Sequence, residues 1–144
     1  MRPLILFLCL YFIIIQNSLA QENAEIERAA LDYIEGFYEG DTTKIKRSIH
    51  PDLSKYGYSR DNKTKKYKGH PMSYDRAIAF AREVSDNSKW AAPKDAVKKI
   101  EILDAQDKIA SVKLTLYWGI DYVLMAKIDN KWMITKVLWQ AVDE

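Results

Sequence analysis

The feature that most constrains the fold is a change in hydrophobic pattern along the chain. Between residues 22 and 93, apolar side chains recur at helical spacing in separate segments. From Val97 onward, β-branched and aromatic runs follow one another with short turns between them. Helices that precede a series of adjacent strands are typical of an α+β domain. We therefore predict a curved, mainly antiparallel sheet with the helices on one face.

Three helices are expected in the first part. Apolar residues of segment 22–40 form one wide stripe, which is typical of an amphipathic helix. Asp41 is suited to cap a second, short helix that ends by Pro51, because proline restricts the residue before it. Ser73 is suited to cap a third helix, and 85–93 is expected to be a loop. The predicted strands are 55–60, 64–68, 97–103, 109–118, 120–128 and 132–141.

Residues 1–20 have the three parts of a secretory signal. Arg2 supplies a positive charge, an apolar run extends from Leu4 to Ile15, and small residues precede Gln21. The run is shorter than the roughly 20 apolar residues that cross a bilayer. We expect cleavage after Ala20, one domain over residues 21–144, a secreted or periplasmic location, and no membrane contact after cleavage.

Composition and motifs exclude several classes of function. Residues 21–144 carry 21 Lys and Arg against 20 Asp and Glu, so no nucleic acid partner is expected. Cys9, inside the export segment, is the single cysteine, so the domain has no disulfide and no thiol nucleophile. Phosphate loops, dinucleotide glycine patterns and nucleophile elbows are absent from the sequence. We expect no metal and no cofactor.

Five segments of the chain have a recognisable combination of residues and spacing: Tyr38-Glu39-Gly40-Asp41, His50-Pro51-Asp52-Leu53, Asp121-Tyr122, Lys127-Ile128-Asp129-Asn130-Lys131-Trp132 and Val137-Leu138-Trp139. Together they resemble the putative lumazine-binding family of the nuclear transport factor 2-like superfamily, which also holds ketosteroid isomerase-like proteins. Asn130 stands where the family usually has glycine, and Leu124 where a histidine is expected. The resemblance implies a cone, in which three helices lean on a strongly bent sheet and enclose a pocket. It also implies a homodimer whose two subunits pair sheet to sheet.

Two residues are candidates for acid–base chemistry. Asp121 interrupts an apolar strand, and superfamily enzymes that resemble this fold use an inward aspartate as a proton-transfer base. Strand alternation places Asp121 and Tyr122 on opposite faces but leaves open which face looks into the cone. His50 ends the second helix, where the helix dipole favours a protonated ring. The alternatives are a surface aspartate paired with a lysine, and a histidine that fixes the corner with Pro51.

The expected site is the cone pocket, lined by aromatic side chains suited to an apolar or aromatic small molecule. Three functions stay open: a non-catalytic binding domain, a proton-transfer enzyme with Asp121 and His50 as acid and base, and a dimeric interaction module with a filled cone and an apolar outer sheet face. We favour binding, because residues suited to catalysis are sparse. The basic residues of segment 60–68 either steer an acidic ligand or protect a strand edge. The predicted pocket residues are Tyr33, Phe37, His50, Tyr58, Asp121 and Tyr122.

Overall fold

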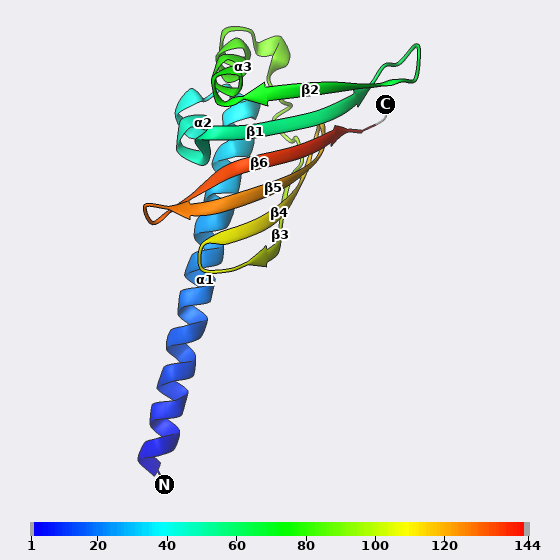
Figure 1. Cartoon of the computed structure of the whole chain (residues 1–144). Helices are drawn as coiled ribbons and strands as arrows, with labels where there is room; N and C mark the ends of the chain where they lie inside the picture. Colours follow the sequence, from blue (N-terminus) through cyan, green and yellow to red (C-terminus); the bar gives the residue numbers. More distant parts are fainter. Residues whose placement is uncertain (1, 143–144) are drawn as a thin grey trace.

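The structure, a computed structural model, describes the backbone of residues 2–142 and the side chains of residues 20–87 and 89–142. It has the α+β architecture expected from the sequence (Figure 1). The elements are α1 (Arg2–Glu39), α2 (Thr42–Ser48), β1 (Ile49–Arg60), β2 (Tyr67–Ser73), α3 (Tyr74–Asp86), the 3₁₀ turn η1 (Ser88–Trp90), β3 (Lys98–Ala105), β4 (Ile109–Leu116), β5 (Gly119–Ile128) and β6 (Lys131–Ala141).

The six strands form one sheet in the order β2-β1-β6-β5-β4-β3. The pairing of β1 with β6 is parallel, and the other neighbours are antiparallel. The helix α1 runs across one face of this bent sheet, and α2 and α3 pack beside it (Figure 1). Because β1 and β6 come from opposite ends of the domain, their pairing joins the helical part to the four-strand meander β3–β6.

Local signals for the helix ends are confirmed. Gly40 has φ 74°, a left-handed conformation that ends α1 without a steric cost. The Asp41 carboxylate accepts hydrogen bonds from the backbone N–H groups of Thr43 and Lys44, and so caps α2. The Ser73 hydroxyl accepts from the backbone N–H of Arg76 and caps α3. These ends are predictable because each depends on residues within one helical turn.

The predicted bounds of the first two strands are wrong. β1 begins at Ile49 instead of residue 55, and its register shifts between Ile49 and Ser54, where the irregularity accommodates Pro51. β2 covers Tyr67–Ser73 instead of 64–68, so the 64–66 segment belongs to a loop. Pro71 is tolerated inside β2 because β2 is an edge strand of the sheet. The segment 85–93 is also not all loop, since α3 reaches Asp86 and η1 follows.

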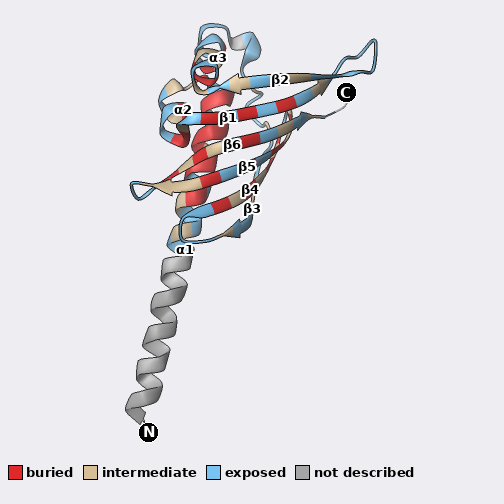
Figure 2. Cartoon of the chain, in the orientation of Figure 1, coloured by how far each residue is buried: buried red, intermediate tan, exposed pale blue. Residues whose placement is uncertain are grey.

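Burial alternates along the strands and separates an inner face, under α1, from an outer face (Figure 2). On β5, Asp121, Val123 and Met125 are buried, whereas Tyr122 and Leu124 are exposed. The inner face of β5 is therefore the face that carries Asp121. Except for Ala20, the expected export segment lies outside the residues described in side-chain detail, and its cleavage stays a prediction. Among the described residues, no helix has both the length and the apolarity needed to cross a membrane.

Candidate functional site

The centre of the cone holds a buried, fully hydrogen-bonded cluster around Asp121. The Asp121 side chain is 0% exposed, and its Oδ2 accepts hydrogen bonds from the Tyr33 hydroxyl at 2.7 Å and from Lys55 Nζ at 3.1 Å. Its Oδ1 accepts from Trp118 Nε1 at 2.8 Å. Lys55 Nζ also donates to the Tyr33 hydroxyl oxygen at 2.5 Å. α1, β1, β5 and the turn before β5 each contribute one side chain.

The Lys55 ammonium group also lies within a cage of aromatic rings. Its Nζ is 5.1–5.6 Å from four ring centroids, a range in which ring quadrupoles attract a cation. Burial lowers the pKa of Lys55, and the Asp121 carboxylate acts in the opposite direction. Burial and then the Asp121 charge raise the pKa of Tyr33 well above its usual 10, so Tyr33 stays a neutral donor. The cage rings are Tyr33, Phe37, Trp118 and Trp139.

This arrangement limits what Asp121 can do chemically. A general base has to reach a substrate proton, but both carboxylate oxygens already accept hydrogen bonds from protein donors. Asp121, Tyr33 and Lys55 do not line the three hollows of about 400, 350 and 590 Å³ at the surface of the described residues. Asp121 is therefore one half of a buried ion pair, and the Lys55 side chain fills the space where the sequence predicted a ligand.

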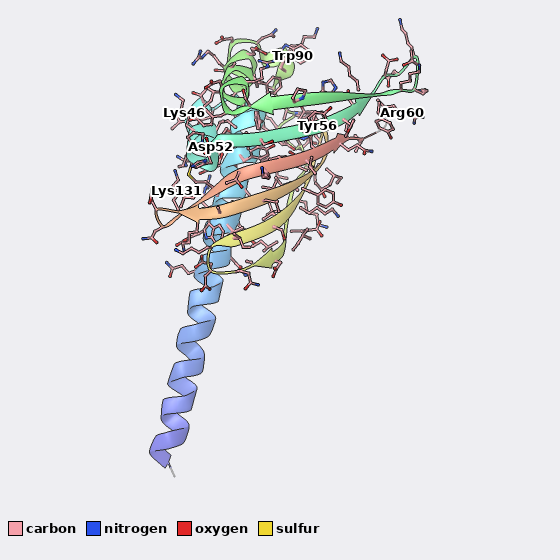
Figure 3. The ribbon with its side chains drawn as sticks, viewed as in Figure 1. Lys46, Asp52, Tyr56, Arg60, Trp90 and Lys131 are labelled. Atoms are coloured by element: carbon pink, nitrogen blue, oxygen red, sulfur yellow. The ribbon has the colours of Figure 1, made fainter. Side chains whose placement is uncertain are left out.

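Open space lies instead at the mouth of the cone, at the end of β1 and β6. A hollow of about 400 Å³ opens there between the β1–β2 hairpin, the β4–β5 turn and the chain after β6. Figure 3 shows Arg60 at this end of β1, and Arg60 lines the hollow together with Ala141 at the end of β6. Trp118 belongs both to this hollow and to the buried cluster, since its indole N–H donates to Asp121. The lining residues are Ser59, Arg60, Asn62, Lys65, Tyr117, Trp118, Ala141 and Val142.

A row of three residues crosses β2, β1 and β6 next to the buried cluster. His70 on β2, Gly57 on β1 and Trp139 on β6 are register partners across the three strands. Gly57 has no side chain, so the Trp139 indole lies over it and stacks on His70 with ring centroids 5.9 Å apart. The Ser59 hydroxyl is 2.7 Å from His70 Nε2. Trp139 also belongs to the ring cage around Lys55, and none of the three residues lines the mouth hollow.

The predicted pocket residues do not all lie together in the structure. Tyr33 and Phe37 are buried on α1 against the cluster, as expected for the inner wall. Tyr58 and Tyr122 are exposed and lie on the outer face of the sheet, so neither side chain reaches the cone. Asp121 is the inward member of the Asp121–Tyr122 pair.

His50 is not brought together with Asp121. The helix α2 ends at Ser48, so His50 belongs to the start of β1 and not to a helix end. Its neighbour Ile49 pairs with Ile134 on β6, whereas Asp121 pairs with Trp139. Five residues of strand separate these positions, which is roughly 16 Å. His50 Nδ1 accepts a hydrogen bond from the Asp52 backbone N–H, so the ring has a local structural contact.

Sequence reasoning missed Lys55, Ser59 and His70. Lys55 and Ser59 were part of a short predicted strand whose inward face was unknown, and a lysine in an alternating run is ordinarily an outer residue. His70 is flanked by Gly69 and Pro71, which are typical of a loop, so its position in the sequence indicated no site role. Within residues 20–87 and 89–142, no group of three or more His, Cys, Asp or Glu side chains is arranged to hold a metal ion.

The outer face of the sheet presents a second feature, a row of exposed apolar side chains. Tyr56, Leu138 and Tyr122 are register partners on β1, β6 and β5, and they are 39%, 63% and 55% exposed. Leu103 and Leu124, also exposed, line a hollow of about 350 Å³ together with this row. Figure 3 shows Tyr56 on the middle of β1.

Comparison with known proteins agrees with this architecture. The family model described as "Putative lumazine-binding" matches residues 21–140. No curated protein matches the chain significantly. Among solved structures, an NTF-2 like protein of unknown function from Silicibacter pomeroyi DSS-3 has a TM-score of 0.66 at 15% identity, covering 86% of this chain and 98% of that one. An NTF2-like protein of unknown function from Shewanella baltica OS155 has a TM-score of 0.61 at 20% identity, covering 87% and 97%. The fold is therefore NTF2-like.

Proposed function

The chain belongs to the putative lumazine-binding family, and from this membership and the site geometry we propose that its domain binds a small molecule at the mouth of the cone without catalysing a reaction. The observation that carries the proposal is the combination of a filled interior and an open mouth. Lys55 and its ring cage occupy the interior, whereas the hollow of about 400 Å³ outside them offers both aromatic and polar side chains. Ligand sites typically combine such surfaces in a concave space.

The same geometry argues against the proton-transfer alternative. Asp121 is paired with Lys55, and His50 lies at the other end of β6 from Asp121. An enzyme of this kind requires its acid and base to reach one substrate. The proposal keeps the expected export: residues 1–20 are removed after Ala20, and the domain works in a secreted or periplasmic setting.

The proposal predicts that protein purified from its own host carries a small molecule. Native mass spectrometry should show an added mass on the wild-type chain. Val142→Trp should abolish it, because Val142 lines the hollow and is 56% exposed, so an indole there occupies the space without disturbing the core. Val97→Trp is the matched control, since Val97 is an exposed valine outside the hollow. A wild-type chain without added mass, or a Val142→Trp chain that retains it, would contradict the proposal.

A second candidate function, self-association through the outer face, is favoured by the row Tyr56–Leu138–Tyr122. Exposed apolar patches that span several strands often mark protein interfaces. We expect a homodimer in sedimentation velocity at micromolar concentration. Leu138→Lys should give a monomer with unchanged unfolding, because the side chain is 63% exposed in the single chain. Trp90→Lys, which changes an exposed aromatic residue on η1 instead, should remain dimeric. A wild-type monomer under these conditions would rule this function out.

A further inference from the structure

The loop between β1 and β2, residues 61–66, is held in one shape by its own hydrogen bonds. The Asp61 carboxylate accepts from the backbone N–H groups of Lys63 and Thr64 at 3.0 and 2.6 Å, and from the Thr64 hydroxyl at 2.9 Å. The Asp61 backbone N–H donates to the Lys66 carbonyl at 3.0 Å, and the Lys65 N–H donates to the Asp61 carbonyl at 2.8 Å. The loop is thus preorganised at the rim of the mouth hollow.

Lys65 occupies a backbone conformation that is unusual for a lysine. Its φ is 58°, in the left-handed region that glycine adopts easily and that costs a residue with a Cβ about 1 kcal/mol or more. Conformations of this kind concentrate where a side chain has to be aimed at a ligand. Here the strained residue is one of those that line the hollow. The closed turn thus holds Lys65 in a fixed backbone conformation at the lining of the hollow.

The Lys65 ammonium group has no ion-pair partner among the described residues. No carboxylate of the described residues lies within ion-pair distance of its ammonium group. The nearby Asp61 carboxylate instead faces the loop amides, and the backbone hydrogen bond from Thr64 lowers the pKa of Asp61. Arg60 lies on the same wall, since its Nε donates to the Lys65 carbonyl at 3.0 Å. Lys65 thus supplies a positive charge to this wall of the hollow.

The facing wall is aromatic and equally fixed. Tyr117 and Trp118 line it, with ring centroids 5.5 Å apart. Tyr38, from α1, locks them in place: its hydroxyl accepts from the Tyr117 backbone N–H at 3.1 Å, and its ring contacts both of theirs. Rigid aromatic surfaces bind flat molecules at little entropic cost.

We propose that the mouth hollow selects a flat organic anion, with Lys65 binding its anionic group while Tyr117 and Trp118 contact its ring system. This inference rests on the proposed small-molecule function and names the class of ligand. Lys65 is the residue that selects charge.

The test compares two flat probes of equal shape, 2-naphthoate and its neutral amide 2-naphthamide, by isothermal titration calorimetry at pH 7 and low salt. We expect the carboxylate to bind about tenfold more tightly, since one partly desolvated ion pair is worth roughly that factor. Lys65→Gly should abolish this preference. It should also leave the protein at least as stable as the wild type, because glycine adopts φ 58° readily. A loss of preference therefore cannot arise from unfolding.

The matched control is Lys63→Gly, which removes the same charge from the same loop at a position outside the hollow lining. It should retain the preference. Equal losses in both variants would overturn the inference, because the attraction would then come from the whole loop. Equal binding of both probes, blocked by Val142→Trp, would overturn the anion class and leave the small-molecule function standing. If neither probe binds and the host-purified protein carries no added mass, the proposed function and the inference both fail.

Discussion

Replacing Asp121 by Asn should lower the free energy of unfolding by about 3–5 kcal/mol, the usual cost of removing one partner of a buried ion pair. The substitution preserves the volume of the side chain but leaves the Lys55 ammonium group in the cone without its counter-charge. Lys55 is 7% exposed, so water cannot solvate it in place of the carboxylate. We therefore expect the main contribution of Asp121 to be to the stability of the fold, in contrast to an inward aspartate that serves as a base.

Urea unfolding followed by circular dichroism measures this effect. Asp52→Asn is the matched control: the Asp52 side chain is 92% exposed, and the expected change is within about 0.5 kcal/mol. Lys55→Met, which retains most of the side-chain volume, should be as costly as Asp121→Asn. The double variant should lose clearly less than the sum, since no unpaired charge remains buried. A loss below about 1 kcal/mol for Asp121→Asn would show that the pair is not buried as described.

Gly57→Ala is expected to destabilise the protein by about 2–3 kcal/mol, because there is no room for a Cβ at this position. A Cβ on Gly57 would overlap the ring atoms of Trp139, and the indole would have to leave its place over β1. Moving it breaks the stacking on His70 and removes one wall of the cage around Lys55. The expected loss therefore combines steric strain with damage to the buried cluster.

Gly69→Ala separates steric strain from the general effect of adding a methyl group to a strand. Gly69 lies on the paired strand β2, and its added Cβ would meet the hydroxyl end of Tyr56, a side chain that is 39% exposed and free to turn outward. Thermal unfolding of the two variants should differ by several degrees, with Gly69→Ala close to the wild type. Equal melting temperatures would contradict the close packing of Trp139 on Gly57.

Together, these contacts give a physical reason for locating function at the mouth of the cone. The Lys55–Asp121 pair, its cage and the His70–Gly57–Trp139 row occupy the interior, and their removal is expected to cost stability. Apart from Trp118, which also belongs to the buried cluster, the mouth hollow is lined by side chains that are at least partly exposed and lie outside the core. Substitutions there can change recognition without unfolding the domain, which is the property that ligand specificity requires.

The sequence alone determined the features that depend on neighbours in the chain. The helix caps at Asp41 and Ser73, the end of α1 at Gly40, and the left-handed turn at Asp129 and Asn130 follow from local backbone chemistry. The order of helices and strands, and the α+β class, follow from the periodicity of apolar residues. Two proline-containing strand segments were misjudged, because whether a proline is tolerated depends on an edge position or a bulge.

Only the tertiary structure decided which side chains meet. Alternation placed Asp121 and Tyr122 on opposite faces, but the position of α1 selected the inner one. The parallel pairing of β1 with β6 brought Lys55 to Asp121 across 66 residues and placed His50 at the far end of the sheet. Gly57, His70 and Trp139 form one row for the same reason. Strand register between distant segments is set by packing of the whole sheet against the helices, and no local pattern in the chain encodes it.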